Sequence, residues 1–386
     1  MTAPIPFLDL AAEQAALRPE LDAAWARVLA GNALILGPEL RAFEAEFAAY
    51  CGTRHALGVG NGLDAISLAL RALGVGPGDA VIVPAHTFVA TWLAVMAVGA
   101  APVACEPAPG SYNISAAMVL PLLTRKTKAV IAVHLYGHPA EPSGLAALCR
   151  DHGIFLIEDA AQAHGAAHAH DAAQAHGAAH AHGAAHAGQP MGSFGQIGCF
   201  SFYPTKNLGA LGDGGAVVTS DDALADKLSL LRNYGAREKY HTDEIGTNSR
   251  LDELQAAILR VKLLHAAAFA GLRRTVAARY TAALADVSGL TLPQTPAGDV
   301  PAWHLYVVRT RQRDALRVHL TGLGIATGLH YPVPVYRNRP FAAFAPSAET
   351  ETDRISAQVL SLPFWPMMPA ASVDRVAGAI RDFFRR

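Results

Sequence analysis

A lysine within the segment SFYPTKNLGALGDGG, residues 201–215, has the surroundings of a reactive amine. Lys206 stands among aromatic residues and glycines, five positions after Ser201. An ordinary surface lysine is the alternative interpretation. A lysine that apolar neighbours desolvate loses its proton more easily and can form a Schiff base with a carbonyl group. Lys206 is therefore a candidate for covalent chemistry.

An aspartate at the end of an apolar run is the second candidate. Asp159 closes IFLIED, residues 154–159. A lone aspartate in such a place is more often a structural cap or a loop anchor. Beside a lysine that carries a pyridoxal ring, however, a carboxylate keeps the pyridine nitrogen protonated and strengthens the electron sink. Asp159 and Lys206 together favour a pyridoxal-phosphate site.

Two further segments could hold such a cofactor. In GVGNGLDAISLAL the backbone N–H groups of Gly62 and Leu63 open a predicted helix, where they could cradle a phosphate; a plain turn is the alternative. Phe88, three residues after the predicted strand AVIVPA, could lie on the face of a flat ring or be a core aromatic. The strand AVHLYG brings His134 and Tyr136 to its carboxyl end, where sites in open α/β sheets gather.

A perfect repeat interrupts the chain after Asp159. DAAQAHGAAHAH occupies residues 159–170 and again 171–182, and GAAHA returns at 183–187. Removal of residues 165–182 leaves EDAAQAHGAAHAGQPMGSFG without a seam, which is typical of a tandem duplication inside a surface loop. Asp159 is preferred to Asp171 as the functional aspartate, because only Asp159 ends an apolar strand.

The histidines of the repeat could in principle chelate a metal. The pairs His164/His168 and His176/His180 would share one face if the segment were helical. The glycines of the repeat weaken any helix, and thiols are absent from it. We therefore expect adventitious affinity for nickel or zinc, and no structural or catalytic metal site.

The elements that must position these residues alternate regularly from about residue 38 to 220. Short β-rich runs such as AVIVPA, KAVIAVHLYG and IFLIED are separated by helical runs such as LDAISLALRAL and PSGLAALCRDHG. This alternation predicts an α/β fold with a mostly parallel sheet that helices cover on both faces. The predicted parts are an N-terminal segment 1–30, a large domain 31–263 with an insertion at 165–182, and a small α+β domain 264–386.

Composition narrows the possible classes of protein. The chain has 386 residues, 52% of them hydrophobic, and a net charge of −1, so no global field favours nucleic acid or an anionic membrane. The four cysteines lack C-x-x-C spacing, which argues against a disulfide framework or a zinc site. The N-terminus does not resemble a signal peptide, and we expect a cytoplasmic protein.

In combination, these segments resemble the DegT-type sugar-nucleotide aminotransferases, which are fold-type I pyridoxal-phosphate enzymes. The resemblance extends from FLDL at Phe7 to the last predicted helix. The segments that carry it are GNGLDAISLAL, VIVPAHTFVATW, IEDAAQAHGA, GSFGQIGCFSFYPTKNLGALGDGGAVVT, NSRLDELQAAIL and GLHYPVP.

The resemblance implies a role for each matching residue. Lys206 would carry pyridoxal 5'-phosphate as a Schiff base and later move the proton, and Asp159 would pair with the pyridine nitrogen. The other implied contacts are Gln162 on the ring hydroxyl, Phe88 stacked on the ring, Gly62, Leu63 and Ser201 on the phosphate, His330 near the sugar nucleotide, and Asn248 on the phosphate of the neighbouring subunit's cofactor. The working unit would thus be a homodimer with two shared sites.

The resemblance also implies a reaction. L-glutamate would leave its amino group on the cofactor as pyridoxamine 5'-phosphate, which would aminate a nucleotide-linked keto-6-deoxyhexose. GNGLDA and PAHTFVATW look most like the branch that acts on dTDP-linked 3-oxo sugars, and a 4-oxo sugar is the alternative. Leu34 and Thr247 stand where many relatives have an aromatic residue and a tyrosine. The exact sugar therefore stays open.

Two other classes of protein remain as hypotheses at this point. One is a non-catalytic regulatory relative, although such a relative has no need of Lys206, Asp159 and Ser201 together. The other is a histidine-rich metal-binding protein on the same scaffold. An absorbance spectrum separates these hypotheses from an aminotransferase, because an internal aldimine absorbs near the visible range and its band moves when L-glutamate is added.

Overall fold

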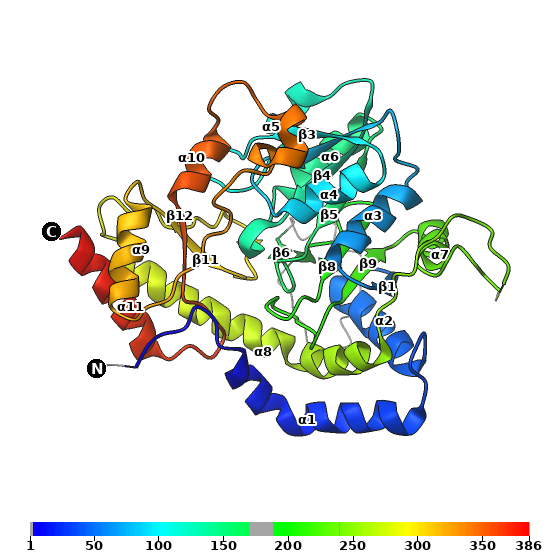
Figure 1. The fold of residues 1–386 in the computed structure, drawn as a ribbon, viewed down its shortest axis with the longest axis horizontal. Coiled ribbons are helices and arrows are strands. Elements are labelled where there is room, and N and C mark those ends of the chain that lie inside the picture. The colour runs from blue at the N-terminus through cyan, green and yellow to red at the C-terminus, as the bar shows by residue number, and fades with distance from the viewer. Residues whose placement is uncertain (1–2, 170–187, 239, 386) are drawn as a thin grey trace.

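A seven-stranded sheet forms the centre of the larger lobe in the computed structural model, which describes residues 3–169, 188–238 and 240–385 (Figure 1). The strand order is β1-β9-β8-β5-β4-β2-β3. All neighbouring strands run parallel except at β9, which is antiparallel to both β1 and β8. The prediction of a mostly parallel α/β sheet is confirmed. The strands are β1 His55–Val59, β2 Ala80–Pro84, β3 Ala101–Cys105, β4 Thr127–Val133, β5 Phe155–Asp159, β8 Ile197–Ser201 and β9 Gly215–Thr219.

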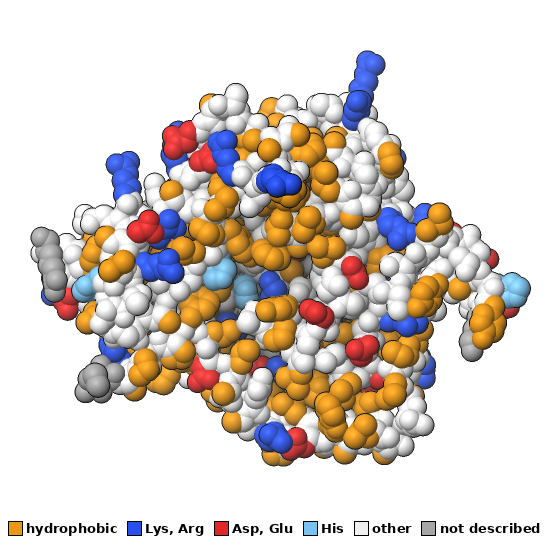
Figure 2. All heavy atoms as spheres, in the orientation of Figure 1, with side chains coloured by type: hydrophobic (Ala, Val, Ile, Leu, Met, Phe, Trp, Pro, Cys, Tyr) orange, Lys and Arg blue, Asp and Glu red, His pale blue; other side chains and the backbone are white. Residues whose placement is uncertain are grey.

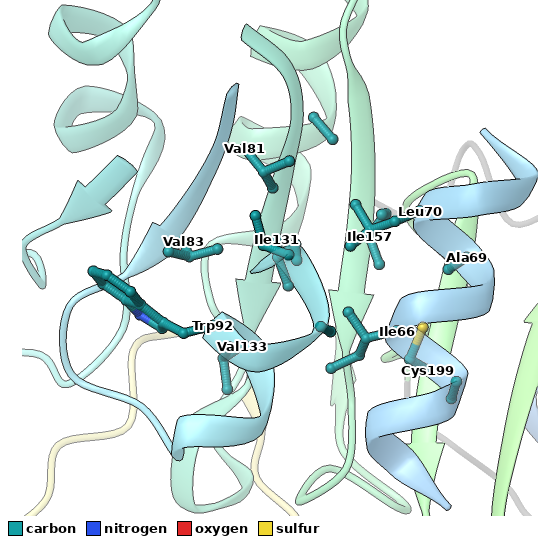
Figure 3. Packing of buried hydrophobic residues seen from close by; sticks show 14 of the residues in the cluster. Ile66, Ala69, Leu70, Val81, Val83, Trp92, Ile131, Val133, Ile157 and Cys199 are labelled. Carbon is teal, nitrogen blue, oxygen red and sulfur yellow. The ribbon is translucent and has the colours of Figure 1, made fainter. Parts of the chain in front are cut away.

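Helices cover both faces of this sheet. On one face α3 (Gly62–Ala72), α4 (Val89–Ala97) and α7 (Asp222–Leu231) enclose an apolar cluster. Figure 3 shows Ile66 and Leu70 of α3 facing Ile157 of the sheet. On the other face lie α2 (Pro38–Cys51), α5 (Ala116–Val119) and α6 (Pro142–Asp151), together with part of α8. Because both faces are buried, the strands read as continuous apolar runs.

Helix α3 begins where the sequence predicts an anion cradle. The Asn61 side chain caps it by accepting a hydrogen bond from Asp64 N at 2.8 Å. Along the helix, Ile66 and Leu70 recur at a spacing of four and are fully buried against the sheet. Burial of each such side chain stabilises the fold by about 1.5–3 kcal/mol. The apolar stripe thus holds the N-terminus of α3 firmly at the edge of the sheet.

The smaller lobe is built on the long helix α8, Glu253–Leu284. It contains the antiparallel pair β11 and β12, and its apolar cluster includes the far end of α8. Helix α8 runs without a break through residue 264, so the division of domains near that residue stays a prediction. The elements of this lobe are β10 Asp299–Val300, β11 Tyr306–Arg309, α9 Arg313–Gly322, α10 Glu351–Gln358, β12 Val359–Leu362 and α11 Ala370–Phe384.

The N-terminal helix α1, Leu10–Gly31, lies along α8 (Figure 1). Lys262 of α8 and Glu13 of α1 form an ion pair with an N–O distance of 3.1 Å, and both are largely buried. Among the described residues, α8 alone is long and apolar enough to span a membrane. Half of its most apolar 18-residue stretch is buried in the fold. Core helices commonly have this character.

The first copy of the repeated GAAHA is part of the core, and the predicted start of the insertion at Gly165 is wrong. Ala166 and Ala167 are buried, and β6 (Ala167–His168) pairs with β10 and with β7 (Gln189–Pro190). GAAHA occurs at residues 165–169 and again at 183–187, so the eighteen extra residues can equally be counted as 170–187. Residues 170–187 lie outside the described residues. Deletion of 165–182 or of 170–187 leaves the same sequence.

His164 and His168 do not share a helix face, since no helix forms over residues 164–168. His164 is buried with its ring 5.3 Å from that of Phe200, whereas His168 lies in β6 and contacts Asp299 at 2.6 Å. His176 and His180 lie outside the described residues. Within residues 3–169, 188–238 and 240–385, no group of three or more potential metal ligands occurs.

Candidate active site

A cavity of about 440 Å³ opens at the carboxyl ends of the parallel strands, between the two lobes. Histidine side chains gather near the middle of the face shown in Figure 2. The cavity is lined by Asn61, Gly62, Leu63, Ile66, Thr87, Phe88, Ala90, Thr91, Val133, Asp159, Ala161, Gln162, Ser201, Tyr203, Thr205, Lys206, Asp213, His304, His330 and Tyr331. All predicted site residues except Asn248 are therefore brought together.

Lys206 lies in the loop that follows β8, and its side chain borders the cavity. Its backbone N–H donates to the carbonyl of Tyr203 at 2.8 Å. Burial lowers the pKa of Lys206 to about 8, while the negative charge of Asp159 opposes that shift. The neutral form of this amine, which is the nucleophile, is therefore much more populated near physiological pH than in an ordinary lysine, although the protonated form still predominates.

Asp159 ends β5 and is buried at the cavity wall. Its Oδ2 accepts a hydrogen bond from Thr91 Oγ1 at 2.9 Å, and its Oδ1 accepts one from Ala161 N at 3.2 Å. Burial raises the pKa of Asp159, whereas these hydrogen bonds and the positive charge of Lys206 lower it. The two donors fix the plane of the carboxylate and oppose its neutralisation.

The N-terminus of α3 and Ser201 meet at one end of the cavity. A Cβ atom built on Gly62 would lie 2.7 Å from the Cβ of Ser201, so only glycine fits there. Because the first N–H groups of a helix lack partners within it, those of Gly62 and Leu63 can donate to an anion. This corner therefore suits a phosphate group.

Phe88 and Gln162 lie on other parts of the wall. Phe88 is the N-cap residue of α4, and half of its surface is exposed, with its ring 5.4 Å from that of Tyr331. Gln162 Oε1 accepts from Tyr136 N at 2.6 Å, and its Nε2 donates to Tyr331 Oη at 3.1 Å. Both residues can thus contact a flat aromatic ring held in the cavity.

Two histidines from the smaller lobe complete the wall. His330 Nδ1 lies 2.8 Å from Ser361 Oγ, and burial together with the positive charge of Lys206 lowers its pKa to about 4. His304 Nδ1 lies 3.3 Å from Asn207 Oδ1. Burial and the nearby positive charges, Lys206 foremost, lower the pKa of His304 well below its ordinary value. Both rings are neutral at physiological pH.

The second pair of strand-end candidates, His134 and Tyr136, takes no part in lining the described cavity. His134 Nδ1 accepts from Ala140 N at 3.1 Å, so its Nε2 donates to Glu158 Oε2 at 3.0 Å. Glu158 is fully buried and also accepts from three N–H groups of residues 192–195. The contact between His134 and Glu158 therefore holds β5, and with it Asp159, in place.

Asn248 is exposed and lies outside the cavity of its own chain, in a bridge with Asn233. Its implied contact with a partner subunit's cofactor stays a prediction. Three residues of the cavity wall had no role predicted from the sequence: Thr91, His304 and Tyr331. Tyr331 adjoins His330 and could have been inferred from that neighbour. Thr91 and His304 are brought to the cavity by contacts between distant segments.

The residues of the cavity fit pyridoxal phosphate. A desolvated amine, a buried carboxylate and a helix N-terminus that has room only for glycine surround one space. They supply, in that order, a covalent anchor, a partner for the pyridine nitrogen and a phosphate cradle.

Residues 16–177 and 167–381 match the model of the DegT/DnrJ/EryC1/StrS aminotransferase family. The chain belongs to this family. The two matched ranges overlap at 167–177, inside the duplicated sequence, as expected when one pattern meets a repeat twice. Enzymes of the family depend on pyridoxal phosphate, and the chain is an aminotransferase.

Named relatives cover nearly the whole chain. The dTDP-3-amino-3,4,6-trideoxy-alpha-D-glucose transaminase of Streptomyces venezuelae is 48% identical over 99% of this chain and 97% of its own length. The erythromycin biosynthesis sensory transduction protein EryC1 of Saccharopolyspora erythraea is 47% identical over 98% of this chain and 99% of its own.

A solved structure agrees with this assignment. The crystal structure of DesV from S. venezuelae in complex with a ketimine intermediate has 48% sequence identity and a TM-score of 0.93, and the match covers 100% of both chains. The fold-type I aminotransferase architecture that the resemblance implied is therefore confirmed.

Proposed function

We propose that the protein binds pyridoxal 5'-phosphate at Lys206 and transfers the amino group of L-glutamate to a nucleotide-linked keto-6-deoxyhexose. The observation that carries this proposal is the pairing of Lys206 with Asp159 at the cavity beneath the N-terminus of α3. Glutamate leaves as 2-oxoglutarate, and the carbonyl carbon of the sugar becomes an amine. The favoured sugar is a dTDP-linked 3-oxo-6-deoxyhexose.

The nature of the sugar rests on relatives. A chain 48% identical to this one is named for a dTDP-linked 3-amino sugar, and one 40% identical, from Aneurinibacillus thermoaerophilus, is named dTDP-3-amino-3,6-dideoxy-alpha-D-galactopyranose transaminase. A 4-oxo sugar is the alternative outcome. A more distant relative, at 33% identity over 88% of this chain, is named for a different sugar nucleotide: GDP-perosamine synthase of Caulobacter vibrioides.

Each residue of the site has a separate task in this proposal. When bound, pyridoxal phosphate supplies an electron sink that weakens the bonds at the carbon bearing the amino group. The Asp159 carboxylate holds a proton at the pyridine nitrogen, and Thr91 holds that carboxylate in place. Gly62 and Ser201 would hold the phosphate. Lys206 would move a proton between the carbon that bears the amino group and the cofactor, and a pKa that burial lowers to about 8 suits an amine that takes up and releases a proton.

The dimer belongs to this proposal. Asn248 is exposed at the surface and is free to reach across an interface. We infer that a second copy of the chain receives this amide at its own phosphate site, so that each dimer holds two shared sites. Such a phosphate contact would add a donor to the cradle formed by Gly62 and Ser201.

A change at Lys206 tests the chemistry. Lys206→Ala is expected to lower turnover by at least three orders of magnitude, because it removes both the covalent anchor and the proton carrier. Wild-type protein should absorb near the visible range with pyridoxal phosphate, and the band should move when L-glutamate is added. Turnover of the variant within tenfold of the wild type would overturn the proposal.

A panel of sugar nucleotides tests the substrate. We expect turnover with a dTDP-linked 3-oxo-6-deoxyhexose to exceed turnover with the 4-oxo isomer by at least tenfold. The reverse preference would assign the 4-oxo alternative. A protein that binds the cofactor but responds to neither L-glutamate nor any sugar would instead support a regulatory role.

A further inference from the structure

Tyr136 holds an unusual position in the fold, although it does not line the described cavity. It lies in the turn Leu135–Gly137 after β4 and is 1% exposed. Its φ of 59° is in the left-handed region, which aromatic residues rarely adopt. Such strained backbone persists only where the surroundings impose it, and it concentrates at functional sites.

Three polar groups of Tyr136 contact three residues of the cavity wall. Its backbone N–H donates to Gln162 Oε1 at 2.6 Å. Its carbonyl oxygen accepts from the backbone N–H of His304 at 2.9 Å. Its hydroxyl donates to the carbonyl oxygen of His330. Residues 162, 304 and 330 belong to separate segments, so Tyr136 connects parts of the wall that are far apart in the sequence.

Gly137 allows these segments to come close together. Its φ is +89°, and a Cβ atom there would lie 2.8 Å from His304 N and 2.9 Å from Trp303 N. Its carbonyl oxygen accepts from Ala302 N at 2.8 Å. The turn therefore contacts residues 302–304 through backbone alone, and any side chain at position 137 would separate them.

The hydroxyl of Tyr136 is itself held in place. His86 Nε2 lies 2.8 Å from the hydroxyl oxygen. Because the hydroxyl hydrogen points to the carbonyl of His330, His86 is the donor in this contact. Burial lowers the pKa of His86 to about 3, so its ring is neutral and has one N–H to give. His86 therefore keeps the same protonation state, and the same hydrogen bond to Tyr136, throughout the physiological pH range.

We propose that Tyr136 is a positioning residue that divides its work between backbone and side chain. Its backbone orients Gln162 and His304, whereas its hydroxyl orients the segment of His330 and Tyr331. This inference rests on the proposed function, in which Gln162 faces the cofactor and His330 the sugar nucleotide. Loss of the hydroxyl alone should therefore affect the sugar and spare the cofactor.

Tyr136→Phe tests this division. The probe is dTDP-3-amino-3,4,6-trideoxyglucose, assayed in reverse with 2-oxoglutarate as amino acceptor. We expect KM for the sugar nucleotide to rise about tenfold, as the loss of one buried hydrogen bond implies, with kcat changed less than threefold. The cofactor absorbance and its response to L-glutamate should match the wild type. An unchanged KM, or an altered absorbance, would overturn the proposal.

Tyr280→Phe is the matched control. Tyr280 is as buried as Tyr136, and its hydroxyl likewise donates to a backbone carbonyl, that of Pro363 at 3.0 Å, but Pro363, unlike His330, is not among the residues that line the described cavity. The Tyr280→Phe variant should lower Tm by about as much as Tyr136→Phe does, and it should leave KM for the sugar nucleotide unchanged. If both variants raise KM equally, the effect of Tyr136→Phe is general destabilisation and the proposal fails.

A readout without cofactor or turnover separates this inference from the proposed function. In the cofactor-free protein, the NMR signals of the His330 ring, identified with His330→Ala, should shift in Tyr136→Phe and not in Tyr280→Phe. If the wild type accepts no sugar nucleotide, the proposed function fails while this shift still supports the role of Tyr136. An unmoved His330 signal refutes that role.

Gly137→Ala tests the backbone part. Its Cβ would push residues 303 and 304 away from the turn, so we expect an altered cofactor absorbance and a slower response to L-glutamate. An absorbance spectrum and a glutamate response identical to those of the wild type would show that the turn does not orient Gln162 and His304.

Discussion

At the scale of single residues, two buried ionisable groups whose pKa values shift in opposite directions characterise the site. Burial lowers the pKa of Lys206 and raises that of Asp159, so it favours the neutral form of both. Their mutual attraction opposes this, as do the hydrogen bonds of Asp159 with Thr91 and Ala161. The result is a carboxylate that can stay charged beside an amine that readily loses its proton.

The rate of cofactor uptake should depend on pH through Lys206. Only the neutral amine attacks the aldehyde of pyridoxal phosphate, and the pKa of Lys206 is lowered to about 8. For cofactor-free protein we expect the rate of uptake, followed by absorbance, to rise with pH, with a midpoint near 8 and a plateau above 9. A rate that does not change between pH 7 and 9 would contradict the lowered pKa.

Asp159→Asn should lower turnover by two or more orders of magnitude, because a neutral amide cannot hold the proton of the pyridine nitrogen. It also removes the charge that raises the pKa of Lys206, so the midpoint of cofactor uptake should move to lower pH. Steady-state kinetics and the uptake profile measure the two effects.

The control for this substitution lies in the repeat. Asp171→Asn carries the same change in the second copy, outside the described residues. We expect its turnover to stay within twofold of the wild type. If the two variants exchange behaviour, the assignment of the functional copy of the repeat is wrong.

At the scale of secondary-structure elements, the ends of strands and helices place the chemistry. Strand β5 presents Asp159, the loop after β8 presents Lys206, and α3 presents its N-terminus. Asn61 and the apolar stripe with Ile66 determine where α3 starts and how it lies on the sheet. The cavity is therefore a consequence of where these elements end.

Gly62→Ala should weaken cofactor binding while leaving the fold intact. The added Cβ would approach Ser201 to 2.7 Å, and relief of such overpacking costs about 1–3 kcal/mol. We expect the Kd for pyridoxal phosphate to rise at least fivefold, as measured by absorbance titration. Gly378→Ala, in α11 with no atom within 4 Å of the added Cβ, should leave that Kd unchanged. Equal Kd values for both variants would refute the phosphate cradle.

At the scale of the whole molecule, the site depends on two lobes and, in our proposal, on two chains. His304 and His330 reach the cavity from the smaller lobe, whereas Lys206 and Asp159 belong to the larger one. The extra residues 170–187 enter after β6 and leave before β7, at a point where β10 of the smaller lobe also pairs. The duplication is therefore added to a hairpin that is already anchored.

Deletion of residues 170–187 should leave turnover within threefold of the wild type. The remaining GAAHAGQP can still form the hairpin, and the entropy of closing a loop grows by only about 0.6 kcal/mol per doubling of its length. Retention on a nickel column should fall, since five histidines are removed. A dead enzyme would show that the segment is required, and a change confined to KM for the sugar would indicate a contact near the substrate entrance.

Mixed dimers test the shared sites. Lys206→Ala and Asn248→Ala should each be nearly inactive as homodimers. After exchange of subunits, one site of each heterodimer should hold both an intact Lys206 and an intact Asn248 from the partner, so up to half of the wild-type activity per heterodimer should return. No recovery despite exchange, shown by native mass spectrometry, would place Asn248 outside the shared site, and an active monomer would exclude the shared site altogether.

The sequence alone predicted residues that line the cavity, Asn248 excepted, and the elements that surround them. Apolar runs and helical periodicity identified β2, β4, β5, α3 and α6 to within a few residues, because local patterns of burial specify such elements. Lys206, Asp159 and Gly62 stand in contiguous segments whose composition predicts the roles that we propose for them, and the resemblance to a family added the reaction and the cofactor.

Only the tertiary structure decided which copy of the repeat completes the hairpin, and how the cavity wall is held together. The hydrogen bond between Thr91 and Asp159 joins residues 68 positions apart, and Tyr136 contacts His330 across 194 positions. Identical copies of GAAHA have identical local sequence, so the sequence cannot tell which copy forms the hairpin. The burial of Ala166 in the core shows that the first copy does. The pKa of Lys206 likewise depends on how much water the surrounding lobes exclude, which no local pattern records.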